Sequence, residues 1–270
     1  IYIYIFFVYI VVLLFIIIFK NMNDLVSVIV PYFKKRRFFR KTIDSIKKQT
    51  YKKLEIIIIY DDTNRSDLNF INFELKKVRS KKIIINKKNL GAGISRNIGI
   101  SKSRGKFIAF LDADDIWHKD KIKNQIEFMK KQKVNFSYTN YLIINEKMKV
   151  IKKVKSPKQV KFKDLLFSCD IGLSSVMLKS DVLKICNFSS LKTKEDYLLF
   201  LNLSKKKIKM MGINKVLMRW RKTENSLSSS TFQKINDALS IYNKHLKFNY
   251  IKSLYCVFIL SLNFLRKRYL

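Results

Sequence analysis

The chain has 270 residues, of which 56 are Lys or Arg and 20 are Asp or Glu, so its formal net charge is +36. A hydrophobic content of 48% with 6 Gly and 2 Pro excludes a disordered, collagen-like or low-complexity protein. The positive field attracts polyanions such as nucleic acid, anionic lipid or sugar nucleotides. Because the sequence has no zinc-finger spacing, aromatic nucleic-acid signature or heptad repeat, we expect no nucleic-acid partner and favour an anionic membrane surface.

The first 19 residues are uninterruptedly apolar and are followed by Lys20. This length suits a bilayer core, and positive charge on the downstream side alone would place the rest of the chain in the cytoplasm. Two interpretations of residues 1–21 stay open: a membrane anchor, and translated sequence upstream of a start at Met22. A signal peptide fits less well, because a basic n-region and a small-residue cleavage site are missing.

Strands and helices alternate in the first half of the chain. Apolar runs predict strands at 26–30, 54–60, 82–86 and 107–111, and helical periodicity or capping predicts helices at 36–49, 66–77, 93–102 and 119–131. Short links between them indicate βαβ units and a mostly parallel sheet. Ligands of such sheets bind beyond the carboxyl ends of the strands.

The regularity weakens after Phe136. Strand-like pieces at 136–144, 174–178 and 215–220 alternate with helices near 162–168 and 196–203, which indicates an antiparallel extension of the same sheet. We therefore expect one domain over residues 22–230.

A helical, basic tail is expected over residues 231–270. Its part from 250 to 265 is apolar and ends in the basic residues 266–268. Such a segment is typical of a helix in a membrane interface. The alternative is that it only packs on the domain, and we favour membrane contact.

An apolar strand at 107–111 ends in three carboxylates, Asp112, Asp114 and Asp115. Oxygen ligands suit Mg²⁺ or Mn²⁺, and such a cation is most useful where a diphosphate is held or must leave. The alternative is an acidic turn that caps the next helix. An Asp-x-Asp pair alone does not decide between the two.

Polar groups also follow the three preceding strands. Pro31 and Tyr32 follow the first, Asp61 and Asp62 the second, and the glycine-rich segment 89–97 the third. Since parallel strands end at the same edge of a sheet, we expect these groups to line one edge together with the acidic turn.

These segments resemble the inverting GT-A nucleotide-sugar glycosyltransferases of family 2. The motifs that carry the resemblance are VSVIVPY (26–32), IDSIKKQTY (43–51), DDTNRSD (61–67), NLGAGISRNIG (89–99) and GKFIAFLDADD (105–115). Their order and spacing match over about residues 25–225. The chain looks closest to bacterial enzymes that build lipopolysaccharide or other surface glycans. The resemblance implies the GT-A fold, a Rossmann-like, mostly parallel sheet flanked by helices with the antiparallel C-terminal extension.

At the nucleobase end of the donor site, the resemblance implies roles for four residues. Pro31 and Tyr32 would line the pocket for the base. Asp62 would accept a hydrogen bond from a uracil-type N3–H, and Asp61 would then be structural.

At the phosphate end, the resemblance implies that Arg96 lies near the base and the diphosphate. Asp112 would face the ribose and diphosphate, and Asp114 would bind the metal ion, Mg²⁺ or Mn²⁺.

On the acceptor side, the segment 194–197 is similar to the family's Glu-Asp motif at the start of a helix. The resemblance implies that Asp196 is the base that takes the proton of the acceptor hydroxyl, and that Glu195 contacts or orients the acceptor. The alternative is that both carboxylates only complement the helix N-terminus.

Two downstream segments also resemble parts of the family. Residues 171–177 correspond to the acceptor side, and residues 218–228 to a mobile loop that closes on the diphosphate, which makes Arg219 and Arg221 candidates for binding it. The family often has a histidine after this arginine-rich strand, and in this chain that place is taken by Lys222 or Thr223. The Gln-x-x-Arg-Trp pattern of processive polymerases is incomplete, because Arg219 and Trp220 are present but the glutamine is not, so we expect transfer of a single sugar.

The expected function is metal-assisted, inverting transfer of one sugar. The donor would be a nucleoside-diphosphate sugar of the UDP or dTDP type, and the acceptor a glycan or lipid-linked molecule. The expected location is the cytoplasmic face of a bacterial inner membrane, with the protein held peripherally or by a single N-terminal anchor.

Two alternatives belong to other classes. A nucleotidylyltransferase needs a glycine-rich phosphate loop after the first strand, where residues 31–35 contain no glycine. A non-catalytic basic protein that binds anionic lipid or nucleic acid would leave the ordered carboxylates unexplained.

Overall fold

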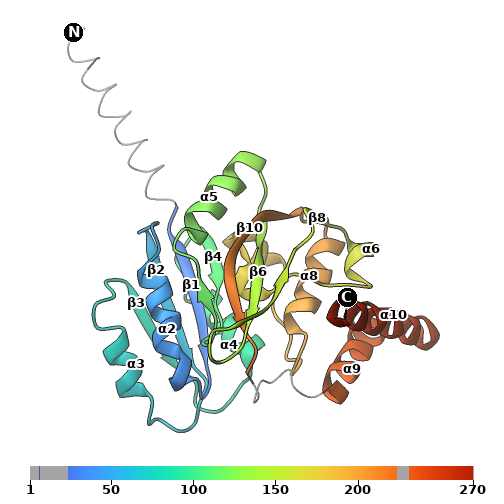
Figure 1. Ribbon diagram of the computed structural model, residues 1–270, viewed down its shortest axis with the longest axis horizontal. Coiled ribbons are helices and arrows are strands. Elements are labelled where there is room, and N and C mark those ends of the chain that lie inside the picture. The colour runs from blue at the N-terminus through green and yellow to red at the C-terminus, as the bar shows by residue number, and fades with distance from the viewer. Residues whose placement is uncertain (1–5, 7–23, 224–230, 270) are drawn as a thin grey trace.

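The computed structural model describes residues 24–223 and 231–269, together with residue 6 (Figure 1). Apart from residue 6, the apolar segment 1–21 lies outside the described residues, as do residues 224–228 of the loop expected to close on the diphosphate. The domain boundaries after residues 21 and 230 stay predictions, because both fall beside parts of the chain that are not described.

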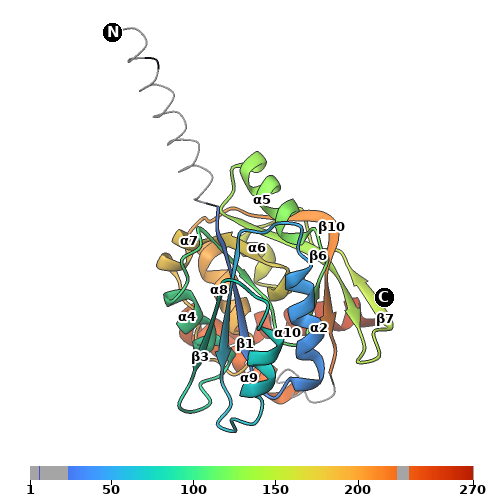
Figure 2. The same ribbon diagram turned by 90° about the vertical axis from the view of Figure 1, so that its left-hand side faces the viewer.

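Among the described residues, ten strands form one sheet in the order β3-β2-β1-β4-β9-β6-β10-β5, with β7 beside β6 and β8 beside β10. The first four strands are parallel, as predicted: β1 (Val26–Tyr32), β2 (Leu54–Tyr60), β3 (Lys81–Ile85) and β4 (Phe107–Phe110). The helices cover both faces of this sheet (Figures 1 and 2). The fold is therefore the α/β arrangement that the sequence predicts.

β1 extends two residues beyond its predicted end and includes Pro31. On one side Pro31 pairs with Ile59 of β2, whereas on the other side the ladder to β4 ends at Ile29 and Phe110. A proline lacks the N–H that a central strand donates, so it is tolerated where one neighbour has ended. Beyond Ile29, β1 is therefore paired on the β2 side but no longer on the β4 side.

Burial on both faces explains why the parallel strands are almost wholly apolar. Ile57 and Ile59 of β2 belong to one core, and Ile56 and Ile58 of the same strand belong to the core on the opposite face. Alternate residues of a strand point to opposite faces, so each core receives its own set of side chains.

The second half of the sheet is mixed. β9 (Met177–Lys179) runs antiparallel between β4 and β6 (Phe136–Ile144), as expected, whereas β10 (Met210–Arg221) runs parallel to β6. The parallel pair follows from the path of the chain, which crosses back through α8 (Glu195–Lys205) before it enters β10. The strands β5 (Ile116–Trp117) and β8 (Gln159–Val160) are too short for periodicity to predict, and β7 (Val150–Val154) has two lysines in its middle that interrupt the apolar pattern.

The remaining helices lie close to their predicted positions. They are α2 (Arg36–Lys47), α3 (Leu68–Glu74), α4 (Ala92–Ser101), α5 (Lys121–Gln132) and α6 (Phe162–Leu165), with α7 (Ser180–Ile185) unpredicted. The apolar stripe of α2 packs through Phe39, Ile43 and Ile46 into one of the two cores.

The helical tail forms α9 (Thr231–Ser240), a π-helical segment (Ile241–His245) and α10 (Tyr250–Tyr269). Ala238, Tyr242, Cys256 and Val257 of the tail belong to the same core as the buried face of α8. The tail therefore packs on the sheet domain. No helix among the described residues is both long and apolar enough to cross a membrane.

Candidate active site

Hydrogen bonds join the polar groups at the carboxyl ends of the parallel strands. Asp61 lies just after β2, and its carboxylate accepts the backbone N–H groups of Leu90 and Gly91 at 2.8 and 2.9 Å and the side-chain amide of Asn86 at 2.7 Å. Gly91 has a φ of +81°, a conformation that glycine adopts at little cost. Asp61 therefore shapes the glycine-rich loop, as the resemblance implies.

Asp62 is buried, but only part of its carboxylate is used within the described chain. Its Oδ1 accepts the backbone N–H of Asn64 at 3.1 Å, and its carbonyl accepts the guanidinium of Arg65 at 2.6 Å. Its Oδ2 thus remains the atom through which a nucleobase could be bound.

Tyr32 is enclosed in the core beneath the edge of the sheet. Its ring stacks on Tyr60 at 5.3 Å, and its hydroxyl donates to Asp67 at 2.6 Å. The ring is fully buried, whereas Pro31 beside it is partly exposed. In a nucleobase pocket, Tyr32 would support the wall and Pro31 would form part of its surface.

Arg96 of α4 connects the two groups of carboxylates. Its guanidinium donates to Asp112 and to Glu195, each at 2.6 Å, and the arginine side chain is only 4% exposed. Although burial opposes the charge, the two carboxylates raise the pKa of Arg96 above its ordinary value. Arg96 thus joins the end of β4 to the first turn of α8, and direct contact with a nucleotide stays a prediction.

Glycine permits the close approach that this bridge needs. A Cβ at Gly93 would lie 2.3 Å from the carbonyl oxygen of Ser189 and 3.3 Å from Glu195 Cγ. The neighbouring Asn97 of α4 exchanges two hydrogen bonds with the backbone of Phe188, at 2.9 and 3.0 Å. α4 and the segment before α8 are therefore held in direct contact.

Asp114 faces a lysine that the sequence motifs do not single out. The Nζ of Lys35 lies 2.7 Å from Asp114 Oδ2 and donates to Thr223 Oγ1 at 3.3 Å. Burial raises the pKa of Asp114, and the charge of Lys35 opposes this shift. The ammonium group of Lys35 therefore already neutralises Asp114, the residue to which the resemblance assigns the metal ion.

The donor set suits a metal ion that is shared with a substrate. The described residues contain no group of three or more His, Cys, Asp or Glu side chains that could hold a metal by themselves. Mg²⁺ is usually held by one or two carboxylates together with phosphate oxygens and water, so Asp112 and Asp114 fit such an ion.

Asp115 and Arg221 fix the backbone of the acidic turn. Asp115 is fully buried, and its Oδ1 accepts the backbone N–H of Arg221 at 2.8 Å. Burial and the charges of Asp114 and Asp112 raise the pKa of Asp115 well above its ordinary value. The Nε of Arg221 donates to the carbonyl of Asp114 at 2.8 Å.

The two arginines of β10 are therefore placed differently. The guanidinium of Arg221 also donates to the carbonyls of Asn145 and Glu146, at 3.3 and 3.2 Å, so it is occupied by the protein backbone. Arg219 is exposed. Of the two, Arg219 keeps its side chain exposed, and its contact with a diphosphate stays a prediction.

The predicted acceptor segment also contacts the acidic turn. The hydroxyl of Ser174 accepts the backbone N–H of Asp112 at 3.0 Å, and its carbonyl accepts the indole N–H of Trp117 at 2.7 Å. Segment 171–177 therefore lies directly against the end of β4.

Asp196 lies in the first turn of α8, where its Oδ1 accepts the backbone N–H of Tyr197 at 2.7 Å. Burial and the charge of Glu195 raise the pKa of Asp196 to about 7, while Arg96 opposes the shift. The contact with the helix N-terminus agrees with the structural alternative. A pKa close to neutrality also suits a group that must accept a proton.

The tail fixes the start of α8 through buried polar contacts. Asp237 of α9 accepts the backbone N–H and the hydroxyl of Thr193, at 2.8 and 2.7 Å. The hydroxyls of Tyr197 and Tyr242 lie 2.8 Å apart. The sequence analysis does not identify these contacts, although Asp237 is the only acid in residues 231–270 and could have signalled one.

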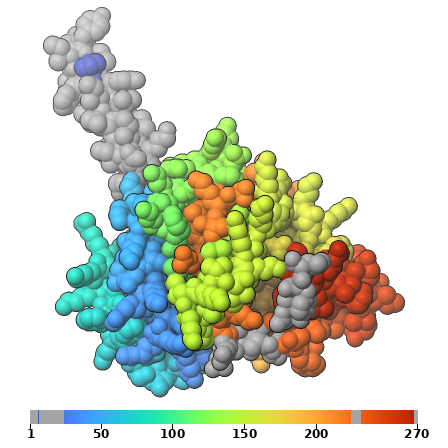
Figure 3. All heavy atoms as spheres, viewed as in Figure 1, coloured from blue at the N-terminus to red at the C-terminus, as the bar shows by residue number. Residues whose placement is uncertain are grey.

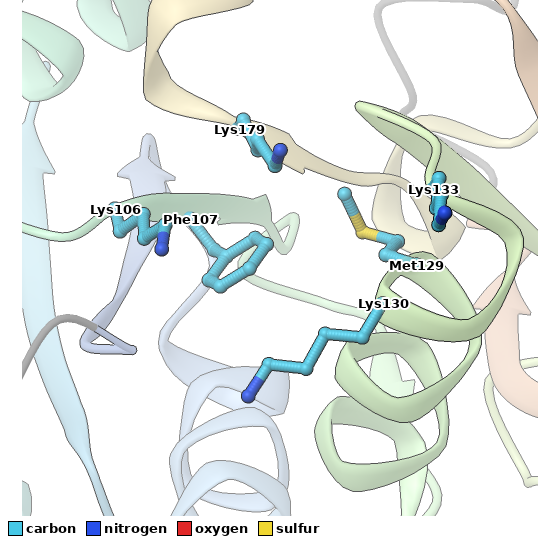
Figure 4. Close-up of a pocket in the computed structure, with 6 residues that line it drawn as sticks. All are labelled: Lys106, Phe107, Met129, Lys130, Lys133 and Lys179. Carbon is cyan, nitrogen blue, oxygen red and sulfur yellow. The ribbon is translucent and has the colours of Figure 1, made fainter. Parts of the chain in front are cut away.

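A basic hollow of about 230 Å³ lies away from these carboxylates (Figure 4). It opens where β4 begins and β9 ends, near the C-terminus of α5. Its lining residues are Lys106, Phe107, Met129, Lys130, Lys133 and Lys179. Because β4 carries Asp112 at its other end, the hollow belongs to the opposite edge of the sheet.

The raised pKa of Asp196 gives a first prediction. In a pH titration of the ¹³C-carboxyl resonances, one aspartate should titrate near pH 7, and this signal should disappear in Asp196→Asn. Glu195→Gln should move the same titration to lower pH, because a neighbouring negative charge is removed and ionisation becomes easier. Exposed Asp181 is the control position. A titration of Asp196 near pH 4 would contradict the assignment.

The contact between Asp237 and Thr193 gives a second prediction. Asp237→Ala leaves two donors of Thr193 without their acceptor, and should lower the free energy of unfolding by about 1–3 kcal/mol in urea denaturation. Asp181→Ala, which removes an exposed aspartate paired with Lys184, should have a much smaller effect. Equal effects of the two substitutions would show that the tail does not depend on Asp237.

Comparisons with known proteins agree with this geometry. The Glycosyl transferase family 2 model matches residues 27–182. The UDP-Glc:alpha-D-GlcNAc-diphosphoundecaprenol beta-1,3-glucosyltransferase WfaP of Escherichia coli is 38% identical over 215 residues, which cover 78% of this chain and 83% of that protein.

Two solved structures share the fold. S. aureus TarS 1–349 in complex with UDP-GlcNAc has a TM-score of 0.69 and 18% identity, and the match covers 88% of this chain and 71% of that one. The mannosyltransferase PcManGT from Pyrobaculum calidifontis, in complex with GDP-Man and Mn²⁺, has a TM-score of 0.66 and 12% identity, with coverages of 87% and 72%. The predicted GT-A fold is thereby confirmed. The chain belongs to glycosyltransferase family 2 and is an enzyme that takes a sugar from a nucleotide-sugar donor.

Proposed function

We propose that the enzyme transfers one sugar with inversion, assisted by Mg²⁺ or Mn²⁺, from a UDP or dTDP sugar to a lipid-linked acceptor. The observation that supports this most strongly is the bridge made by Arg96. The buried guanidinium joins Asp112, at the predicted donor side, to Glu195, beside the predicted base. An enzyme that brings a leaving group and a nucleophile together needs both carboxylate groups in one place.

The choice of substrates is supported by the relatives. The name of WfaP states a UDP-glucose donor and a diphosphoundecaprenol-linked acceptor, and the TarS structure holds UDP-GlcNAc. We therefore favour UDP over dTDP for the donor, and an acceptor carried on a polyprenyl diphosphate over a free glycan.

At the nucleobase end, Pro31 and the carboxylate of Asp62 would face the base. The Oδ2 atom of Asp62 would accept the hydrogen bond of the uracil N3–H, while its Oδ1 stays on the backbone N–H of Asn64. Tyr32 would hold the wall behind them through its bond to Asp67.

At the phosphate end, Asp112 and Asp114 would hold the metal ion, which when bound supplies positive charge to the departing nucleoside diphosphate. The ammonium of Lys35 lies beside Asp114 and would compete with the metal ion for the negative charge of this carboxylate. Arg219, exposed on β10, would add a second positive group.

On the acceptor side, Asp196 would take the proton of the attacking hydroxyl. With a pKa of about 7, its carboxylate is ionised in a large fraction of molecules at neutral pH and still basic enough to accept the proton. Glu195 would be held by Arg96 and would orient the acceptor. A single displacement from the face opposite the leaving group inverts the anomeric centre.

We place the enzyme at the cytoplasmic face of a bacterial inner membrane, where a lipid-linked acceptor would be reached. Its attachment would be peripheral or through the N-terminal segment 1–21. The net charge of +36 supports an anionic membrane surface as a partner.

The third prediction tests the two carboxylate roles. Asp196→Asn should lower the rate of transfer from UDP-glucose about 10²–10⁴-fold, because the general base is removed, while the affinity for UDP in the presence of Mn²⁺ stays within a few fold. Asp114→Asn should instead abolish the increase in melting temperature that Mn²⁺ together with UDP produces. The readouts are radiolabelled transfer to a polyprenyl-diphosphate sugar and thermal unfolding.

Exposed Asp181→Asn serves as the control, since it lies on α7 and is paired with Lys184. Full transfer by Asp196→Asn would remove the base assignment. A product with retained anomeric configuration, seen by NMR, would remove the single-displacement mechanism.

The fourth prediction concerns Lys35. Lys35→Met removes the ammonium group that lies 2.7 Å from Asp114 Oδ2, so the affinity of the nucleotide-free enzyme for Mn²⁺ should rise several-fold in electron paramagnetic resonance titrations. Lys41→Met, an exposed lysine of α2, removes the same charge at a distance and should leave the affinity nearly unchanged. A lower Mn²⁺ affinity of Lys35→Met would mean that Lys35 does not compete with the ion.

A further inference from the structure

α10 has apolar residues on two opposite sides. One side packs on the domain, where Cys256 and Val257 belong to the core and Leu260 lies against it. On the other side, apolar side chains stay exposed within the part of the chain that the structure describes, although the ring of Tyr255 also lies near that of Phe167. The residues of this side, here called the outer stripe, are Ile251, Leu254, Tyr255, Phe258, Leu262 and Leu265, with exposed fractions of 80, 45, 58, 60, 40 and 45%.

The spacing of the outer stripe shows that it is a single surface. Apart from the adjacent Leu254 and Tyr255, its members follow one another at intervals of three or four residues along α10, so at about 100° per residue all six fall within one face of the helix. The packed residues lie about half a turn away. Isolated exposed apolar residues are normal on a protein surface, but a continuous stripe of this length marks a docking surface.

The charges around the stripe indicate what it docks to. Lys252 and Arg266 are exposed and lie along one edge of the outer stripe, while Lys267 pairs with Asp170 at 2.5 Å. The only acid of residues 231–270, Asp237, is buried against Thr193. A second copy of this face would bring like charges together, whereas anionic lipid headgroups complement them.

We propose that α10 lies in the surface of an anionic bilayer, with the outer stripe immersed at the boundary between headgroups and acyl chains. Lys252 and Arg266 would reach the lipid phosphates from the rim of the stripe, since long basic side chains extend from an apolar face to the headgroups. The aromatic rings of Tyr255 and Phe258 would lie at the same level.

Contacts between α10 and the acceptor side give this docking a consequence. Asn263 donates to the carbonyl of Phe167 at 3.0 Å, and the ring of Tyr255 lies 6.2 Å from that of Phe167. The segment after Phe167 leads into residues 171–177, which contact Asp112 through Ser174. A docked α10 would hold the acceptor side close to the bilayer. Only this position of the acceptor side rests on the proposed function, whereas the docking of α10 does not.

The test introduces an indole into the stripe of the full-length chain. Phe258→Trp is mixed with vesicles of brominated phosphatidylglycerol and phosphatidylcholine, and its fluorescence is compared with that of the unsubstituted chain, whose Trp117 and Trp220 give the baseline. Phe73→Trp is the matched control, because Phe73 is 69% exposed and lies on α3, on the opposite side of the molecule (Figure 3).

The indole at position 258 should be blue-shifted and at least about twofold more quenched than the baseline, whereas the one at position 73 should not differ from it. The signal is local to α10, so attachment through residues 1–21 would not produce it. No extra quenching at position 258, or equal quenching at both positions, overturns the proposal. A blue shift that grows with protein concentration without lipid would indicate a second copy and overturns it too.

A second arm tests the charges. In the Phe258→Trp background, Arg266→Glu should weaken binding to phosphatidylglycerol vesicles at least about fivefold. Lys133→Glu makes the same change at an exposed lysine beside the hollow of Figure 4 and should have a smaller effect. Equal effects would mean that net charge alone attracts the protein, and would overturn the role of the rim.

These measurements need no donor, metal or acceptor. Failure of the lipid test therefore leaves sugar transfer standing, and normal transfer by Asp196→Asn would leave the docking of α10 standing. The two proposals can fail separately.

Discussion

The guanidinium of Arg96 is the interaction on which the site depends. Burying an arginine is costly unless its charge is compensated, and here Asp112 and Glu195 each accept from it at 2.6 Å. Arg96 in turn stabilises Asp112 and Glu195, because one cation holds two carboxylates that would otherwise repel each other. The bridge requires α4 to approach the start of α8 within the space that Gly93 leaves, so the fold around it cannot relax without separating the two groups of acids.

The parallel sheet brings the donor-side groups together, but it does not close the site. β1, β2 and β4 deliver Pro31, Asp62 and Asp112 to one edge because parallel strands end at the same side. The acceptor-side acids arrive on α8, which follows β9 and precedes β10. They are held by the tail, through Asp237 and Tyr242. The active site is therefore shared between a regular βαβ half and a second half whose position is fixed by individual polar contacts.

This division explains how much of the protein could be predicted from its sequence. β2 and β6 begin and end where the sequence predicts. β2 is a nearly continuous apolar run, which marks a buried strand irrespective of its neighbours, and β6 is rich in aromatic and β-branched residues, which favour a strand. The acidic turn is visible because acids are scarce in a chain with 20 Asp and Glu against 56 Lys and Arg. Lys35 is invisible for the opposite reason, since nothing local distinguishes it among so many basic residues. Its contact with Asp114 spans 79 positions of the chain, and such pairings leave no periodic pattern. The same holds for β5 and β8, which are two residues long and exist only because β10 offers them an edge.

The apolar residues of α10 lie on two sides of one helix, and only one of these sides packs on the domain. An apolar run of this kind can either pack on the domain or lie in a membrane interface, and sequence reasoning treats these as alternatives. The structure shows that one side of α10 packs through Cys256 and Val257, and that the opposite side keeps Ile251 and Phe258 exposed. A helix packed only on the domain would carry polar residues on its outer side, because exposed apolar area adds nothing to folding and favours aggregation. Because one side of α10 packs on the core, the direction in which the outer stripe faces is fixed relative to the domain. A membrane that bound the outer stripe would therefore also hold the acceptor side of the site in a fixed orientation.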